Sequence, residues 1–154
     1  MKKNFITGAK EPLNLGEFNI KIYTAATFAE QARIRHNKET LLQLGHTVTA
    51  TWLEESLFVR PDGMPEETFE RKMAIKDLQE VAMADCLILD VENPSKTAGK
   101  MVETGFALAK HKLIYVVGKP PPHSIFLLLA DKHFPTWNDL FEYFKEHHKV
   151  PGHS

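Results

Sequence analysis

Residues 86–117 read Cys86-Leu-Ile-Leu-Asp-Val91, then Pro94-Ser-Lys-Thr-Ala-Gly-Lys-Met-Val-Glu103-Thr-Gly-Phe-Ala-Leu-Ala109, and then Leu113-Ile-Tyr-Val-Val117. The two short apolar runs are typical of strands that are buried on both faces of a parallel sheet. Pro94 and Gly99 interrupt the strand pattern, and apolar residues then follow at helical spacing. The sequence therefore predicts a strand, a loop, a helix and a second strand, with Glu103 near the amino end of the helix.

The same alternation extends along the chain. Strands are predicted over residues 19–25, 46–53, 86–91, 113–118 and 134–136; helices are predicted from Thr27 to Gly45, over 66–84, after Gly99, over 125–129 as a short buried helix, and from Thr136 onwards. Thr27 and Glu30 have the spacing of a capping box for the first helix. This is an α/β pattern, and we expect a flavodoxin-like five-stranded, mostly parallel sheet with helices on both faces and strand order 2-1-3-4-5. Residues 1–18 are expected to form an amino-terminal arm, 19–148 a single domain and 149–154 a frayed tail.

The composition of the 154 residues argues against several classes of function. A net charge of -1 gives no electrostatic footprint for a nucleic-acid polymer or an anionic membrane surface. No run approaches the roughly 18 apolar residues of a membrane span, and we expect a cytoplasmic protein. The single cysteine, Cys86, lies in an apolar run, where a buried inert thiol is the usual finding. The eight histidines show no metal-ligand spacing, so no metal site is predicted.

Two loops are expected to meet at the carboxyl ends of the first and third strands. One carries Tyr23, Thr24 and Thr27, and the other leads through Thr97 to Glu103. Open α/β sheets bind ligands at this point, because the helices that follow the two strands lie on opposite faces. A carboxylate here can be a nucleophile or a base, although a glutamate near a helix terminus can also do no more than complement the helix dipole. Thr27 can likewise serve only as a helix cap.

Three short patterns, taken in order, resemble one enzyme family. They are Ile22-Tyr23 at the end of the first strand, Asp77-Leu78 ahead of Ala84-Asp85, and Gly99-x-x-x-Glu103-x-Gly105-x-Ala107 before a Lys-x-Ile-x-Val-Val strand. Together they resemble the nucleoside 2-deoxyribosyltransferase superfamily, which includes the 2'-deoxynucleoside 5'-monophosphate N-hydrolases. The similarity covers roughly residues 19–145 in pattern.

The resemblance implies catalytic roles for three residues. Glu103 falls on the family nucleophile, which attacks the anomeric carbon and releases the base. Tyr23 falls on the tyrosine that hydrogen-bonds this carboxylate, and Asp77 falls on the acid near the leaving base. A mid-helix aspartate such as Asp77 can also belong to the solvated face of its helix. The chemistry suits these residue types, because a carboxylate stabilises oxocarbenium character and can trap it covalently.

The residues around the expected 5' position favour the hydrolase branch. Thr97 stands where the transferases carry an aspartate and the hydrolases a serine. Ser124 stands where the transferases place an asparagine that reaches across a subunit interface, and Thr27 matches a phosphate-contacting serine of the hydrolases. One departure is Ala29, which replaces the hydrolase arginine, so that Arg33 or Arg35 would have to take its place.

The resulting prediction is an N-hydrolase that cleaves a 2'-deoxyribonucleoside 5'-monophosphate through a covalent glycosyl-Glu103 intermediate. The alternatives are a nucleoside 2-deoxyribosyltransferase and a non-catalytic nucleotide-sensing module. The expected catalytic residues are Glu103, Tyr23 and Asp77, and the expected substrate-binding residues are Thr24, Thr27, Thr97, Gly99 and Ser124. No cofactor is expected, the ligand is a small nucleotide or nucleoside, and the active form is expected to be a homodimer or a higher homo-oligomer.

Overall fold

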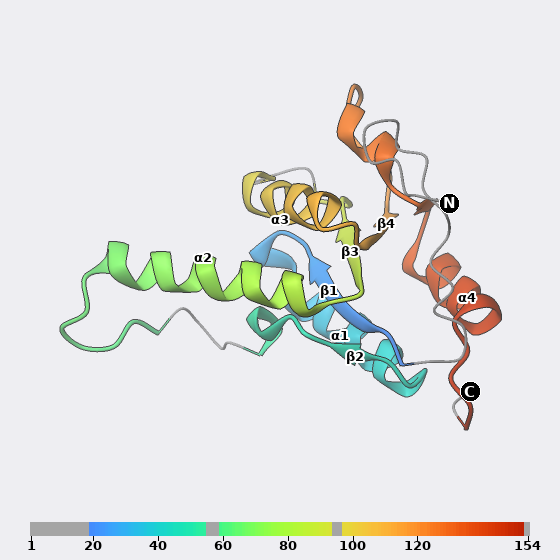
Figure 1. Cartoon of the computed structure of the whole chain (residues 1–154), viewed down its shortest axis with the longest axis horizontal. Coiled ribbons are helices and arrows are strands. Elements are labelled where there is room, and N and C mark those ends of the chain that lie inside the picture. The colour runs from blue at the N-terminus through green and yellow to red at the C-terminus, as the bar shows by residue number, and fades with distance from the viewer. Residues whose placement is uncertain (1–18, 55–58, 94–96, 153–154) are drawn as a thin grey trace.

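The computed structural model describes residues 19–54, 59–93 and 97–152, so the predicted arm over 1–18 lies outside the described residues. Its elements in order are β1 (Lys21–Ala25), η1 (Phe28–Glu30), α1 (Gln31–Gln43), β2 (Thr47–Val48), η2 (Thr51–Leu53), α2 (Glu66–Met83), β3 (Cys86–Asp90), α3 (Ala98–Ala109), β4 (Leu113–Val117), η3 (Ile125–Leu129), β5 (Lys132–Phe134) and α4 (Trp137–His147), where η denotes a 3-10 helix. Figure 1 shows the helices arranged around the sheet.

The five strands form one sheet in the order β2-β1-β3-β4-β5, and every neighbouring pair is parallel. This confirms the predicted fold class and strand order. On one side α2 packs against α3, and α1 contacts α4. Because α1 follows β1 and α3 follows β3, the chain leaves the two adjacent strands toward different helix layers. The carboxyl ends of β1 and β3 are therefore the switch point at which such sheets bind ligands.

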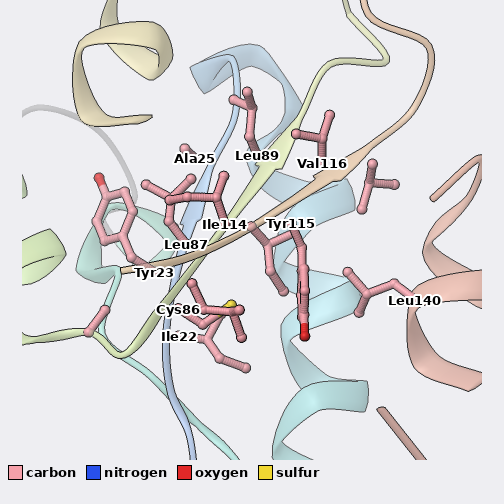
Figure 2. Close-up of a cluster of buried hydrophobic side chains, with 14 of the residues drawn as sticks. Ile22, Tyr23, Ala25, Cys86, Leu87, Leu89, Ile114, Tyr115, Val116 and Leu140 are labelled. Atoms are coloured by element: carbon pink, nitrogen blue, oxygen red, sulfur yellow. The ribbon is translucent and has the colours of Figure 1, made fainter. Parts of the chain in front are cut away.

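The core is built from the central strands. All five residues of β3 and all five of β4 are buried, which explains their continuous apolar sequences. In β1 the side chains alternate between the two faces, and Figure 2 shows Tyr23 pointing away from the side on which Tyr115 and Leu140 lie. Tyr115 packs edge-on against Phe144 of α4. Tyr23 therefore faces the layer that contains α3.

The predicted strand over residues 46–53 is mostly wrong. Only Thr47–Val48 pairs with β1, and Thr51–Leu53 forms the 3-10 turn η2. The carboxylate of Glu80 accepts hydrogen bonds from the backbone N–H of Thr51 at 3.0 Å and from its hydroxyl at 2.6 Å. The indole of Trp52 is buried and donates to the carbonyl oxygen of Thr24 at 2.9 Å. These side-chain contacts replace the ladder bonds of a longer strand.

The capping box predicted at Thr27 is also absent. Thr27 precedes the 3-10 turn η1 and makes no side-chain cap hydrogen bond, and α1 begins only at Gln31. The carboxylate of Glu30 instead accepts hydrogen bonds from Arg33 at 2.8 Å and from Asn93 at 3.0 Å. The Glu30 carboxylate is therefore bound to Arg33 and Asn93, whereas a capping box requires it to bind the backbone N–H of Thr27.

Two further predictions concern the carboxyl-terminal part. Residues 125–129 do form a short 3-10 helix, but only Leu127 is buried, while Ile125, Phe126 and Leu128 are exposed. The prediction that this segment is buried is therefore wrong. The last helix is predicted from Thr136, and α4 begins at Trp137 with Thr136 as its cap, which accepts a hydrogen bond from the backbone N–H of Asp139. None of the described helices is long and apolar enough to cross a membrane.

Candidate active site

Glu103 and Tyr23 are in direct contact at the switch point. Glu103 lies on α3, close to the amino end of that helix, and Tyr23 lies on β1 with its side chain fully buried. The Tyr23 hydroxyl donates a hydrogen bond to Oε2 of Glu103. The bond joins residues 80 positions apart in the sequence, and it exists because α3 covers the face of the sheet to which Tyr23 points.

The surroundings of Glu103 favour its protonated form. The pKa of Glu103 is raised to about 7: burial raises it most, the hydrogen bond from Tyr23 lowers it, and the charges of Asp77 and Glu80 raise it. Burial and the neighbouring carboxylates raise the pKa of Tyr23, so the phenol stays a hydrogen-bond donor. Glu103 can therefore change between the acid and the carboxylate near neutral pH. The carboxylate is the form that can act as a nucleophile, so it becomes available in this pH range.

A cavity of about 370 Å³ opens onto Glu103. It is lined by residues from β1 to η1, from η2, from α2 and from α3, namely Ala26, Thr27, Phe28, Ala29, Trp52, Asp77, Gly99, Lys100 and Glu103. Asp77 reaches it from α2 and also lines a neighbouring cavity of about 470 Å³ along that helix. A Cβ built on Gly99 has nothing within 4 Å, so this position leaves space in the cavity. Tyr23 thus contacts Glu103 directly, and the other predicted residues Thr27, Asp77 and Gly99 line the cavity onto which Glu103 opens.

A second cavity of about 140 Å³ lies beside the first. Thr97 and Ser124 both line it, together with Lys100, which lines the first cavity as well. The Ser124 hydroxyl donates to the carbonyl oxygen of Pro121 at 2.6 Å. Thr97 and Ser124 are therefore neighbours of the Glu103 cavity within a single chain.

Thr24 is placed differently from the other predicted residues. It is the neighbour of Tyr23 in β1, so its side chain points to the opposite face of the sheet. Its hydroxyl is buried without a hydrogen-bond partner among the described residues, and Thr24 lines none of the three cavities. In the described structure it contributes its carbonyl oxygen, which holds Trp52 at the wall of the Glu103 cavity.

The two arginines considered as replacements at Ala29 are engaged elsewhere. Arg33 donates from Nη1 and Nη2 to the two carboxylate oxygens of Asp90 at 2.8 and 3.0 Å. Asp90 is buried, and it also accepts a hydrogen bond from the indole of Trp137 at 2.7 Å. Arg35 donates from Nε and Nη2 to the carbonyl oxygen of Leu53. Both guanidinium groups therefore stabilise the fold, and neither lines the cavities described above.

Lys100 is the site residue that the sequence analysis missed. Its side chain is buried, and its ammonium group donates to the hydroxyl of Thr27 at 3.2 Å and to the carbonyl oxygen of Asn93 at 2.9 Å. The sequence feature that could have identified Lys100 is its spacing from Glu103. Lys100 lies three positions before Glu103, and residues three apart in a helix share a face. A lysine in the first turn of a helix is usually solvated, so the spacing alone did not predict a buried side chain.

No group of three or more His, Cys, Asp or Glu side chains in the described ranges could hold a metal ion. The chemistry available from this arrangement is that of an ionisable carboxylate, a phenol that orients it, and a second carboxylate across a cavity large enough for a small organic molecule.

Comparisons with known proteins show the family and the fold to which this chain is similar. Residues 22–124 match the family model described as nucleoside 2-deoxyribosyltransferase. A 2-deoxyribosyltransferase from Bacillus psychrosaccharolyticus has a similar structure, with a TM-score of 0.66 and 21% identity over 85% of this chain and 98% of that one. A conserved protein from Enterococcus faecalis V583 gives a TM-score of 0.61 at 18% identity, covering 84% and 99% of the two chains. The CMP N-glycosidase BcmB from Clostridium botulinum gives 0.53 at 14% identity, covering 82% and 98%. A comparison with curated proteins gave no match.

Proposed function

Because the chain belongs to the nucleoside 2-deoxyribosyltransferase family, we propose that it cleaves the N-glycosidic bond of a 2'-deoxyribonucleoside 5'-monophosphate, with Glu103 as the nucleophile. The family acts on N-glycosyl bonds, so the chain is an enzyme of this type. The observation that carries the role of Glu103 is its position: a half-buried carboxylate that is oriented by Tyr23 and opens onto a cavity shared with Asp77.

The first step breaks the bond between the sugar and the base. One carboxylate oxygen of Glu103 attacks C1' as the C1'–N bond lengthens, and Asp77 gives a proton to the departing base nitrogen. The hydrogen bond from Tyr23 fixes the carboxylate and favours its ionised form. The products are the neutral base and a glycosyl ester on Glu103.

The second step hydrolyses this ester. Asp77, now ionised, takes a proton from a water molecule whose oxygen attacks C1', and the C1'–O bond to Glu103 breaks. The step releases 2-deoxyribose 5-phosphate and restores both carboxyl groups to their starting states. A transferase would differ only here, because a second base would attack in place of water.

The choice of a monophosphate is supported by the hydroxyl groups near Glu103. Thr27 lines the Glu103 cavity, and Thr97 and Ser124 line the adjoining small cavity. Neutral hydroxyl groups close to the amino end of α3 suit an anion, and the O–H of Ser124 would turn from the carbonyl oxygen of Pro121 to the phosphate. An aspartate at position 97, as expected in the transferase branch, would repel a phosphate.

We further propose that the active form is a homodimer or a higher homo-oligomer in the cytoplasm. Ser124 is followed by the exposed apolar side chains of Ile125, Phe126 and Leu128, and an exposed group of this kind is common at interfaces between subunits. Sedimentation of the wild-type protein and of Phe126→Asp tests this proposal. We expect the wild type to sediment as an oligomer and the variant as a monomer, and a monomeric wild type would contradict the proposal.

The function is tested by product analysis on a panel of deoxy- and ribonucleoside monophosphates and the matching nucleosides, each with and without a second base. A hydrolase releases free base and 2-deoxyribose 5-phosphate without an acceptor, a transferase forms a new nucleoside only with one, and a sensing module yields neither. Glu103→Gln should abolish turnover, whereas the matched variant Glu142→Gln on the exposed face of α4 should behave as the wild type. Intact-protein mass spectrometry of a quenched reaction should show a glycosyl adduct that Glu103→Gln lacks.

A further inference from the structure

Lys100 is a buried cation at the junction of the two cavities. Only 3% of the residue is exposed, yet it lines both the cavity of Glu103 and the smaller cavity of Thr97 and Ser124. Among the described residues it is the only basic residue that lines either cavity. Any full positive charge that the described lining residues offer to a ligand in the two cavities therefore comes from Lys100.

Within the described ranges, the ammonium group of Lys100 is only partly satisfied by hydrogen bonds. Two of its three N–H donors bind neutral oxygens, those of Thr27 and Asn93, and the group forms no ion pair with a carboxylate of the described residues. A buried charge is normally paired, because its transfer out of water is costly. Burial also lowers the pKa of Lys100, as expected for a cation that has lost its hydration. The site is therefore suited to an anionic ligand that would supply the missing charge partner.

The rest of the site makes a cation necessary for an anionic substrate. Glu103 and Asp77 both line the larger cavity, so a substrate that carries a phosphate dianion approaches a negatively charged region. Arg33 and Arg35 are held by Asp90 and by the carbonyl oxygen of Leu53, and Ala29 brings no charge. Without Lys100, the described lining residues would offset the carboxylates of Glu103 and Asp77 only with neutral groups at the amino end of α3.

We propose that Lys100 binds the 5'-phosphate of the substrate and thereby selects nucleoside monophosphates over nucleosides; this inference rests on the proposed function. The phosphate occupies the smaller cavity with Thr97 and Ser124, and the sugar and base occupy the larger cavity with Glu103. Lys100 holds the boundary, where the 5' carbon must pass. Its hydrogen bond to the hydroxyl of Thr27, which lines the larger cavity, holds the ammonium group at this boundary. The positive charge thus comes from α3 and not from η1, where Ala29 stands.

The test compares kcat/KM for a deoxynucleoside monophosphate and for the same deoxynucleoside in the wild type, Lys100→Met, Lys100→Arg and Lys112→Met. Lys112 is the matched control, because it also donates to a carbonyl oxygen, that of Ala82 at 2.7 Å, but lines none of the three cavities. Loss of a charge-assisted hydrogen bond should lower the monophosphate-to-nucleoside ratio about 30- to 100-fold in Lys100→Met. Lys100→Arg should keep most of the ratio, and Lys112→Met should keep all of it.

A binding measurement separates this inference from the proposed function. Calorimetric titration with 2-deoxyribose 5-phosphate and with 2-deoxyribose reports phosphate binding without turnover, and the advantage of the phosphate should disappear in Lys100→Met. If the wild type shows this advantage but cleaves no monophosphate, the proposed function fails while the role of Lys100 stands. If Lys100→Met keeps the ratio and the binding advantage, or loses both substrates equally, Lys100 is a structural residue and the inference is overturned.

Folding of the variants is verified by thermal melting, and a second readout uses the wild type itself. The Nζ resonances of labelled lysines are followed while 2-deoxyribose 5-phosphate is added. Binding of the phosphate at Lys100 should shift one lysine resonance and raise the pKa of that group. A titration in which the sugar phosphate binds but no lysine resonance responds would overturn the inference.

Discussion

Replacing Glu103 by glutamine should make the protein inactive and, at alkaline pH, more stable. The pKa of Glu103 is about 7 in the folded chain against an ordinary value of 4.5, mainly because folding removes water from the carboxyl, and also because of the charges of Asp77 and Glu80. Between these two pH values the folded chain binds more protons than the unfolded chain. The free energy of unfolding therefore falls as the pH rises from about 4.5 to about 7, and the loss is complete above that range.

The size of this loss follows from the difference between the two pKa values. At about 1.4 kcal/mol for each pKa unit, the ionised Glu103 lowers the free energy of unfolding by about 3 kcal/mol above neutral pH. Glutamine keeps the shape of the side chain and an acceptor for Tyr23, but it carries no charge. Glu103→Gln should therefore exceed the wild type by about 3 kcal/mol at pH 8 and by less than about 1 kcal/mol at pH 5.

Urea unfolding followed by tryptophan fluorescence measures both values, since Trp52 and Trp137 are buried and report on loss of the core. Glu142→Gln on the surface of α4 is the control and should follow the wild type at both pH values. Equal stability of Glu103→Gln and the wild type at pH 8, or a difference that does not change with pH, would show that ionisation of Glu103 does not destabilise the folded chain. The raised pKa would then be the wrong explanation for its reactivity near neutral pH.

Three further predictions concern the site and its support. In a pH–rate profile of the wild type, kcat/KM should rise with pH up to about 7 as Glu103 ionises. In Tyr23→Phe this rise should move to higher pH, and kcat should fall about tenfold or more, because Glu103 loses the hydrogen bond that favours its ionised form. Asp90→Ala should cost about 3 kcal/mol in urea unfolding, because the buried indole of Trp137 and the guanidinium of Arg33 both lose their acceptor. Thr136→Ala should cost about 1 kcal/mol in the same assay, because α4 loses its cap.

Each of these has an outcome that contradicts it. An unchanged acid limb in Tyr23→Phe would mean that the phenol does not favour the ionised form of Glu103. A stable Asp90→Ala would mean that the contacts of Asp90 with Arg33 and Trp137 contribute nothing to stability. For α4, a loss as large as that of Asp90→Ala would point to a role for Thr136 beyond capping.

The sheet was predictable because its signals are local. The apolar runs that became β3 and β4 have the length and composition of doubly buried strands, and the loops between the helices and strands carry ordinary breaking residues. The strand order then placed Tyr23 opposite the helix of Glu103, and the structure joins them by a hydrogen bond. Their catalytic roles, like those of Asp77 and the hydroxyl residues, stay predictions.

The errors arose where distant side chains decide the local conformation. The strand after His46 is cut short because Glu80, on another element, binds the backbone of Thr51. The capping box fails because Arg33 and Asn93 take the carboxylate of Glu30. The burial of Lys100 was not predicted, because it depends on contacts with Thr27 and Asn93 that form only in the folded chain.

The contact between Tyr23 and Glu103 also makes catalysis a reporter of folding. Its partners are 80 positions apart, so it forms only when β1 and β3 have paired and α3 has docked on them. Contacts of such large sequence separation are late events, because a long loop must close first. During refolding, helical circular dichroism should therefore recover ahead of turnover, and the appearance of turnover marks the moment at which the two halves of the sheet have joined.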